Sequence, residues 1–193
     1  MTAADAKTKI EKAFPGIKLR LVRESLLVEN PADLLKLAAW LKESPDFKLD
    51  YLSSATGADL LTYLEVIYHL YSIAHKDRSL VLRARTDREK ASLPSLVPVF
   101  RGAEYQEREV YDMYGIRFEG HPDLRRIFMW DGFEGWPLRK DYLQEDAETL
   151  EIADVNWLEK RGIKIPAELR RQAEELNRQG KRAVAQKEGK EAG

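Results

Sequence analysis

The pattern of apolar and polar positions predicts alternating helices and strands in the first part of the chain. Residues 3–13 have the composition of a helix, and apolar residues at every second position over residues 17–22 predict a strand with one buried face. Residues 25–29 can pair with that strand as the second arm of a hairpin. Leucine and alanine then recur at three- and four-residue steps over residues 34–41, which predicts a helix with Asn30 as its N-cap.

The following segment has the alternation and composition of β-structure. Residues 47–58, residues 61–73 and the segment around Leu80 and Leu82 predict three further strands. Together with the earlier elements they predict a helix-backed antiparallel sheet, which is an α+β layer pair.

The chain changes character at Gly115. Apolar residues at three- and four-residue steps predict a helix over residues 99–114, and Gly115 suits the position just after its end. Residues 115–142 are crowded with glycine, proline and aromatic residues, which predicts an irregular segment. Residues 166–186 predict a polar helix in a basic stretch, which is either a solvated surface or an arm lying across a neighbouring protein.

Composition narrows the classes of function. The 193 residues include 32 Lys and Arg against 33 Asp and Glu, and this balance argues against bulk binding to nucleic acid or anionic lipid. The chain has no cysteine, which excludes disulfides, thiolate zinc sites, cysteine-ligated iron–sulfur clusters and a cysteine nucleophile. No stretch approaches about 18 uncharged apolar residues, and the first residues carry no apolar run, so we expect a soluble chain without a signal peptide.

Residues 107–142 carry the strongest chemical signal. Glu109 and Asp112 stand three residues apart and therefore share one face of the predicted helix. Planar guanidinium groups pair bidentately with carboxylates. The residues thus predict a loop tied by Arg–carboxylate bridges, either to its own helix or to another protein. The cations that the irregular segment presents for this purpose are Arg117, Arg125, Arg126, Arg139 and Lys140.

Other chemistry is open to the same residues. Glu107, Glu109 and Asp112 are candidates for a carboxylate metal site or an acid–base pair, although helical spacing alone does not build a cleft. His121 is a candidate either for titration near neutral pH or for a hydrogen bond that fixes the loop. No Walker or GxGxxG pattern accompanies the arginines, which argues against nucleotide binding. Three aromatic side chains can stack on a ligand or anchor a protein interface: Trp130, Phe133 and Trp136.

The same stretch resembles the signature of a known family, the thirty-kilodalton subunit of respiratory complex I. This protein is also called the C-type subunit of NADH–quinone oxidoreductase, and it is related to the J-type subunit of chloroplasts and cyanobacteria. The segment 137–142, Pro-Leu-Arg-Lys-Asp-Tyr, also resembles that family. The residues that carry the main part of the resemblance are Glu107, Arg108, Glu109, Asp112, Met113, Tyr114, His121, Arg125, Arg126 and Ile127.

The resemblance implies an architecture. The fold class would be α+β, with a mixed β-sheet covered by helices and an extended C-terminal region that packs on partner subunits. We therefore expect an α+β domain over residues 1–120. An extended loop and a C-terminal helical arm are expected over residues 121–193.

The resemblance also implies a function. The chain would be a cofactor-free, non-catalytic accessory subunit in the peripheral arm of a proton-translocating NADH–quinone oxidoreductase. FMN and Fe–S clusters in other subunits would carry electrons from NADH to quinone. The expected partners are the Fe–S cluster subunits and the forty-nine-kilodalton subunit, which carries the letter D and is called the D-type partner below. Membrane association is expected only through the complex, on the cytoplasmic face of the bacterial inner membrane or on the mitochondrial matrix side.

The residues expected to fix the loop and its docking face share a charged or hydrogen-bonding side chain. No catalytic, cofactor-binding or metal-binding residue is expected. The predicted interface and loop-fixing residues are Glu107, Arg108, Glu109, Asp112, His121, Arg125, Arg126, Arg139 and Asp141.

Two alternatives stay open at this point. The first is the same scaffold role in a ferredoxin-dependent or membrane-bound hydrogenase-type complex. The second is a stand-alone metalloenzyme that uses Glu109, Asp112 and His121 on a divalent metal.

Overall fold

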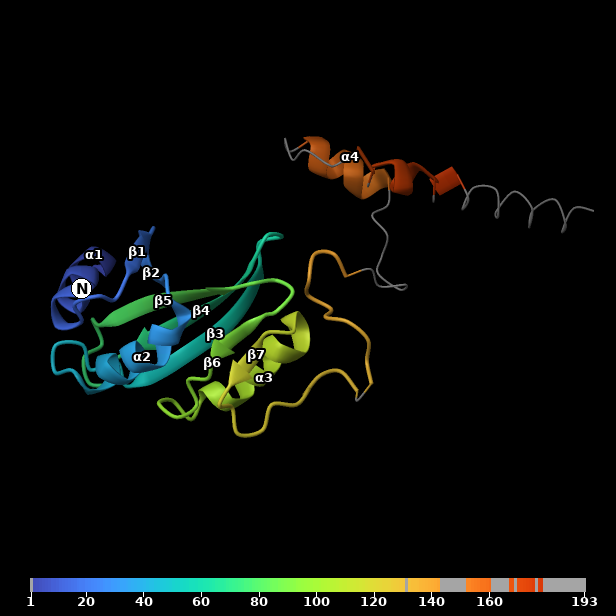
Figure 1. Cartoon of the computed structure of the whole chain (residues 1–193). Coiled ribbons are helices and arrows are strands. Elements are labelled where there is room, and N and C mark those ends of the chain that lie inside the picture. The colour runs from blue at the N-terminus through green and yellow to red at the C-terminus, as the bar shows by residue number, and fades with distance from the viewer. Residues whose placement is uncertain are drawn as a thin grey trace, which may run out of the picture. The chain divides into compact units, whose positions relative to one another are not determined.

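The chain divides into two compact units, residues 1–142 and residues 143–193. The computed structural model describes residues 2–130, 132–142 and 152–160, and residues 167, 168, 170–175, 177 and 178. In chain order, the elements of the first unit are α1 (Ala3–Ala13), β1 (Leu19–Val22), β2 (Ser25–Val28), the 3₁₀ turn η1 (Pro31–Asp33), α2 (Leu34–Glu43), β3 (Tyr51–Asp59), β4 (Leu64–Tyr71), β5 (Ser79–Thr86), β6 (Ser92–Pro94), α3 (Ala103–Tyr114) and β7 (Arg117–Glu119) (Figure 1).

Five strands form one mixed sheet in the order β1–β2–β5–β4–β3, and β6 pairs with β7 separately. β1 and β2 form an antiparallel hairpin and β3, β4 and β5 an antiparallel meander, but β2 and β5 pair in parallel. The chain crosses from β2 through α2 to the far edge at β3 and returns strand by strand. This path brings β5 beside β2 in the same direction. The sheet is therefore mixed, as the family resemblance implied, and the purely antiparallel sheet predicted from the residue pattern is wrong.

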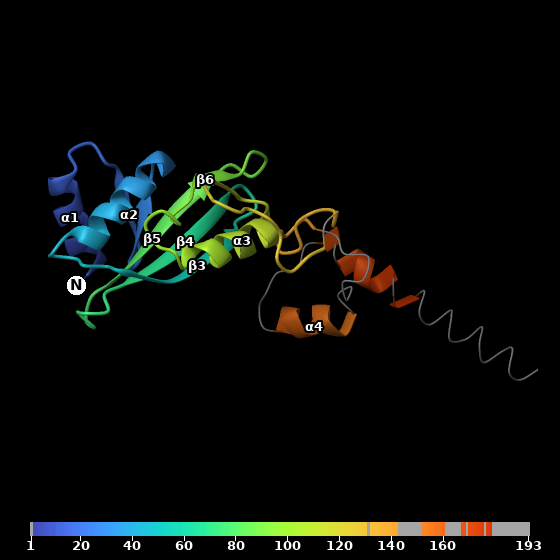
Figure 2. The same ribbon diagram turned by 90° about the horizontal axis from the view of Figure 1, so that it is seen from below.

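One face of the sheet forms the core. Along β4 and β5 every second side chain is fully or almost fully buried, and α2 and α3 cover this face (Figures 1 and 2). The opposite face of the sheet also holds one buried charge. The Glu65 carboxylate accepts hydrogen bonds from Arg83 and Arg85, each at 2.8 Å, which compensates for its burial. The alternating core residues are Leu64, Val66, Tyr68, Leu70, Leu80, Leu82 and Ala84.

The local signals at helix ends correspond to the structure. α1 spans the residues predicted for it, and the Asn30 side chain accepts a hydrogen bond from the Ala32 amide as an N-cap, here of the 3₁₀ turn that leads into α2. The helix predicted over residues 99–114 begins later, at Ala103, and ends at Gly115 in the left-handed conformation. The φ angle of +74° at Gly115 is one that a side chain disfavours.

The predicted buried face of residues 17–22 is wrong at one position. Leu19 is buried, but Leu21 is exposed. β1 is an edge strand of the sheet, so its side chains are covered from fewer directions than those of β4 or β5.

The unit boundary differs from the predicted one. Residues 121–142 belong to the first compact unit rather than to an extended region, and the boundary lies after Tyr142. Hydrogen bonds from this segment to α3 and to the sheet, described below, account for the difference. None of the helices in the described ranges is both long enough and apolar enough to cross a bilayer.

The second unit contains α4 (Ile152–Lys160), which the sequence pattern did not predict. Within this unit Val155 and Ala173 are buried, and Arg170 pairs with Glu159 at 2.8 Å. Of the helix predicted over residues 166–186, residues 167, 168, 170–175, 177 and 178 are helical, and the remainder lies outside the described residues.

Gly57 in β3 sets how closely α3 approaches the sheet. A Cβ atom at this position would overlap the ring of Tyr114, the last residue of α3. The absence of a side chain on Gly57 therefore lets the end of α3 lie directly against the edge strand.

We predict that Gly57→Ala lowers the free energy of unfolding by about 1–3 kcal/mol, because the added methyl group must displace the Tyr114 ring. Gly102→Ala is the matched control, since a Cβ there meets no atom within 4 Å, and it should change stability by less than about 0.5 kcal/mol. Urea unfolding of both variants measures the difference. Equal stability of the two variants would contradict this account of the contact.

Candidate functional site

The segment 121–142 runs along α3 from the first turn of the helix to its last (Figure 1). Near its start His121 contacts the Glu104 carbonyl, and near its end Arg139 contacts the Tyr114 carbonyl. Between these points the segment has no regular secondary structure, but its main chain is fixed by side chains of α3. We call residues 121–142 the docking loop.

Asp112 is the centre of this arrangement. Its carboxylate is fully buried, and one oxygen accepts the backbone amides of Ile127, Phe128 and Met129 at 2.9, 2.7 and 3.0 Å. The other oxygen accepts a hydrogen bond from Arg126 at 2.9 Å. Burial opposes ionisation, but the three amides and the guanidinium outweigh it and lower the pKa of Asp112. The carboxylate therefore stays charged and holds three consecutive residues of the docking loop.

Arg126 extends this hold to the next part of the loop. Its guanidinium also donates to the carbonyls of Phe133 and Gly135, at 3.1 and 3.0 Å. It lies 4.4 Å from the centroid of the Trp136 ring, in cation–π geometry. The planar donor fork thus serves a carboxylate, two carbonyls and an aromatic face at once, which the single ammonium of lysine cannot do.

Arg108 holds the segment immediately before Arg126. The side chain is almost completely buried and donates to the carbonyls of Arg125 and Arg126, at 3.1 and 3.3 Å. The side chain of Arg125 points elsewhere, to Asp123 at 2.8 Å. Two arginines of the predicted set therefore act on the main chain of the loop rather than on a ligand.

His121 fixes the start of the loop through both ring nitrogens. Nε2 lies 3.0 Å from the Glu104 carbonyl oxygen, and Nδ1 accepts the amide of Asp123 at 3.0 Å. Since a carbonyl oxygen can only accept, this pattern assigns the proton to Nε2 of a neutral ring. The geometry corresponds to the loop-fixing alternative for this histidine.

A second buried carboxylate holds the end of the loop. Asp59, the last residue of β3, accepts the Lys140 amide at 2.8 Å and the Leu61 amide at 2.7 Å. Arg88 bridges Asp59 and Asp141. Burial opposes ionisation of Asp59, but the hydrogen bonds from Arg88 and the two amides outweigh it and lower its pKa from 3.8 to about 2.

Glu107 acts on a different segment. It is fully buried and accepts hydrogen bonds from the Ser95 hydroxyl and the Leu96 amide, both at 2.6 Å. It therefore fixes the turn that follows β6 rather than the docking loop. No cation compensates for its burial, which raises the pKa of Glu107 from 4.5 to about 7 despite the two hydrogen bonds.

Glu109 is the one acid of the predicted set that the fold leaves in solvent. It is exposed on α3 and makes no hydrogen bond or ion pair with the residues that the structure describes. Glu109, Asp112 and His121 do not converge, because the last two are engaged with the loop main chain. In the described ranges no cluster of His, Cys, Asp or Glu is placed to hold a metal ion.

Between its two carboxylate clamps the docking loop displays apolar side chains. Ile127, Phe128, Trp130 and Leu138 are exposed, and 68% of Trp130 is accessible to solvent. Phe133 packs edge-on against the Trp130 ring at 4.7 Å between centroids. Main-chain groups are thus fixed while large apolar groups are presented, which is an arrangement typical of a protein-binding surface rather than of a catalytic centre.

Asp59 and Arg88 were missed from the sequence. They belong to separate turns of the sheet, and Arg88 and Asp141 are 53 residues apart. A single acid at a strand end and an arginine in a charged turn have no local pattern that would mark them as partners.

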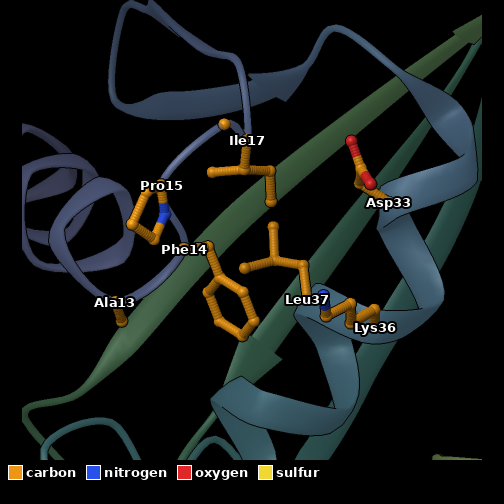
Figure 3. A pocket seen from close by; sticks show the side chains of 8 residues that line it. Ala13, Phe14, Pro15, Ile17, Asp33, Lys36 and Leu37 are labelled. Carbon is orange, nitrogen blue, oxygen red and sulfur yellow. The ribbon is translucent and has the colours of Figure 1, made fainter.

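A pocket of about 430 Å³ lies elsewhere, between the end of α1 and the start of α2 (Figure 3). Phe14, Ile17 and Leu37 supply most of its apolar lining, and Asp33 and Lys36 lie at its side. It contains none of the predicted site residues. We therefore do not place a catalytic site there.

Comparison with known proteins adds to this geometry. Residues 27–148 match a protein-family model described as respiratory-chain NADH dehydrogenase, 30 Kd subunit. A C-type subunit of NADH-quinone oxidoreductase from Rhizobium meliloti (strain 1021), numbered 2 in its name, is 46% identical over 115 residues, which are 58% of this chain and 62% of that protein. The chain thus spans about three fifths of the length of that curated relative.

Two further matches bear on the fold and on partners. The C/D subunit of NADH-quinone oxidoreductase from Phocaeicola vulgatus is 47% identical over 116 residues, which are 60% of this chain and 22% of that protein. A solved trypsin-resistant fragment (1-134) of Nqo5 is similar in structure, with a TM-score of 0.50 and 28% identity over 63% of this chain and 98% of the fragment.

We predict that Asp112→Asn speeds hydrogen exchange at the amides of Ile127, Phe128 and Met129 by at least about tenfold, because a neutral amide oxygen is a weaker acceptor than a carboxylate. Exchange in β4 and β5 should not change. Glu109→Gln, one turn earlier and exposed, is the matched control and should leave all of these amides as they are. Unchanged protection in Asp112→Asn would refute the clamp.

We predict that Glu107 makes the protein less stable as the pH rises. Because its pKa is about 7 in the folded chain and 4.5 when exposed, the folded state binds more protons between these values. The stabilising contribution is complete below pH 4.5 and is lost as the pH rises to about 7, by on the order of 3 kcal/mol.

Glu107→Gln should remove this slope in urea unfolding curves, and Glu109→Gln should keep it. A Glu107→Gln variant with the wild-type slope would show that another group titrates in this window.

Proposed function

Because the chain belongs to the 30 Kd subunit family of respiratory-chain NADH dehydrogenase, we propose that it docks through residues 121–142 onto a D-type partner, the forty-nine-kilodalton kind of subunit, in an NADH–quinone oxidoreductase. In this role the chain carries no redox chemistry of its own. Other subunits that hold FMN and Fe–S clusters pass the electrons from NADH to quinone, and this chain keeps them in position. The complex lies at a membrane, with this chain in its peripheral arm on the cytoplasmic or matrix side.

The observation that carries the proposal is the exposure of Trp130 on a loop held at both ends by buried carboxylates. Asp112 fixes the main chain just before this residue, and Asp59 fixes it again at Lys140. A loop that is ordered before binding loses little conformational entropy on binding. Exposed tryptophan and other large apolar groups on such a loop supply the energetic centre of an interface.

The partner is proposed from the relative in Phocaeicola vulgatus. Its name joins the letters C and D in one subunit, and the present chain matches only 22% of it. Fusion of the two types in one chain favours their being neighbours when they are separate chains. The charged groups of the signature also support a docking role, because Asp112, Arg108, Arg126 and His121 are all engaged in holding the loop.

The test is affinity purification of the tagged full chain from membranes of its native cells, with mass spectrometry of the proteins that co-purify. We expect a D-type partner together with flavin- and cluster-bearing subunits. A hydrogenase-type large subunit without the NADH-oxidising module would keep the docking role and move it to the alternative complex. A chain that co-purifies with none of these subunits would overturn the proposal.

We predict that Trp130→Ser lowers the amount of co-purified D-type partner at least about tenfold, since truncation of a central interface tryptophan costs about 2 kcal/mol or more. Thermal unfolding of the isolated variant should match wild type, because the side chain is exposed. Arg126→Ala should lower the yield similarly by releasing the loop. Tyr51→Ser is the control, since Tyr51 is a half-exposed aromatic residue on the edge strand β3, and it should leave the yield unchanged.

The proposal fails if Trp130→Ser and Tyr51→Ser recover the partner equally well.

A further inference from the structure

The connection between β3 and β4 presents two adjacent exposed leucines. Leu60 and Leu61 form the tip of this hairpin, and 60% of Leu61 is accessible to solvent. The tip lies at the end of the sheet towards which the docking loop also extends, as both views of the ribbon show (Figures 1 and 2). Two solvent-exposed leucines at a turn need an explanation, because turns usually carry glycine, asparagine or aspartate.

Leu61 is also held in a backbone conformation that leucine disfavours. Its φ angle is +69°, in the left-handed region, where glycine and asparagine are the usual residues. The Asp59 carboxylate accepts the Leu61 amide at 2.7 Å and fixes the turn. The Leu60 amide also donates to the Tyr63 carbonyl at 3.0 Å, which closes the hairpin. Folding therefore gains nothing from a leucine at this position, which points to a role outside the folded chain itself.

One carboxylate joins the hairpin tip to the docking loop. Asp59 accepts the Leu61 amide through one oxygen and the Lys140 amide through the other. Arg88 then connects the same carboxylate to Asp141. The tip and the end of the docking loop are therefore fixed relative to each other.

The exposed apolar groups of the described chain concentrate on these two segments. Six of its ten large exposed hydrophobic side chains lie on them: Leu60, Leu61, Ile127, Phe128, Trp130 and Leu138. Exposed charges at Lys140 and Asp141 border the junction between tip and loop. Apolar groups with a charged rim have the composition of a protein interface.

We propose that Leu60 and Leu61 are a second anchor of the interface, inserting into an apolar pocket of the same D-type partner that binds the docking loop. The inference rests on the proposed function and adds to it a named contact. Continuity through Asp59 assigns the tip to that partner, because a surface rigidly joined to the docking loop faces the same neighbour. The positive φ of Leu61 is retained because the side chain is needed in the partner's pocket.

The test uses Leu61→Gly in the tagged full chain, with the D-type partner in the membrane fraction as the probe. Glycine adopts a positive φ freely, so the isolated variant should melt at the wild-type temperature or above it. The amount of co-purified D-type partner should nevertheless fall at least about tenfold. Leu61→Met, which keeps a flexible apolar side chain, should recover most of the binding.

Ile73→Gly is the matched control. Ile73 lies just beyond the other end of β4 and is exposed to the same extent, at 62%. Its replacement should leave the yield of the partner unchanged. A fall in the yield for both variants would show a general effect of glycine near the ends of β4 and would overturn the anchor.

The outcomes separate this inference from the proposed function. If Leu61→Gly retains the partner while Trp130→Ser loses it, the hairpin anchor is refuted and the docking loop stands. If the wild-type chain recovers no D-type partner, both fall. A lower melting temperature for Leu61→Gly would refute the argument from backbone conformation.

Discussion

The Asp112 carboxylate has no contact with water, and an ionised group in that position must take all of its hydrogen bonds from protein donors. Three of these donors are consecutive amides of residues 127–129, and the fourth is Arg126. The need to satisfy one buried charge therefore determines the path of the whole segment that follows β7. The same guanidinium that neutralises the carboxylate holds the Phe133 and Gly135 carbonyls, so the constraint passes on along the loop.

Asp59 repeats this arrangement at the other end of the loop. It is also buried, also receives backbone amides and is also paired with an arginine, in this case Arg88. Gly57, two residues earlier on the same strand, admits the Tyr114 ring at the end of α3. The edge strand thus positions both α3 and the last residues of the loop, and the exposed aromatic residues lie between two fixed points.

Features that depend on neighbouring residues could be predicted from the sequence. The extent of α1, the cap at Asn30 and the end of α3 at Gly115 each follow from short patterns, and the structure agrees with all three. The Arg–carboxylate bridges expected of the loop include the pair formed by Arg126 and Asp112, which are 14 residues apart. Its identification was helped by the family signature, which contains both residues.

Features that depend on distant pairing could not be predicted in the same way. Alternation predicts that a segment is a strand, but it contains no information on which strand lies beside it, so the parallel pairing of β2 with β5 was missed. The bond from the Lys140 amide to Asp59 joins residues 81 apart and uses a main-chain donor, which every residue type except proline offers. The docking roles of the site residues stay predictions, and Glu107 and Glu109 show that adjacent positions of a signature can serve different segments.

The late position of the loop in the chain has a consequence for synthesis on the ribosome. The sheet and α3 emerge first, with Asp59 and Asp112 already in place, but the donors that compensate these two acids come from residues 126–140. A nascent chain that has released only its first 120 residues therefore contains two acids without their final partners and cannot complete its core around ionised groups. Folding of the first unit becomes complete only when Tyr142 has left the exit tunnel, so the fold and its binding surface mature in the same step.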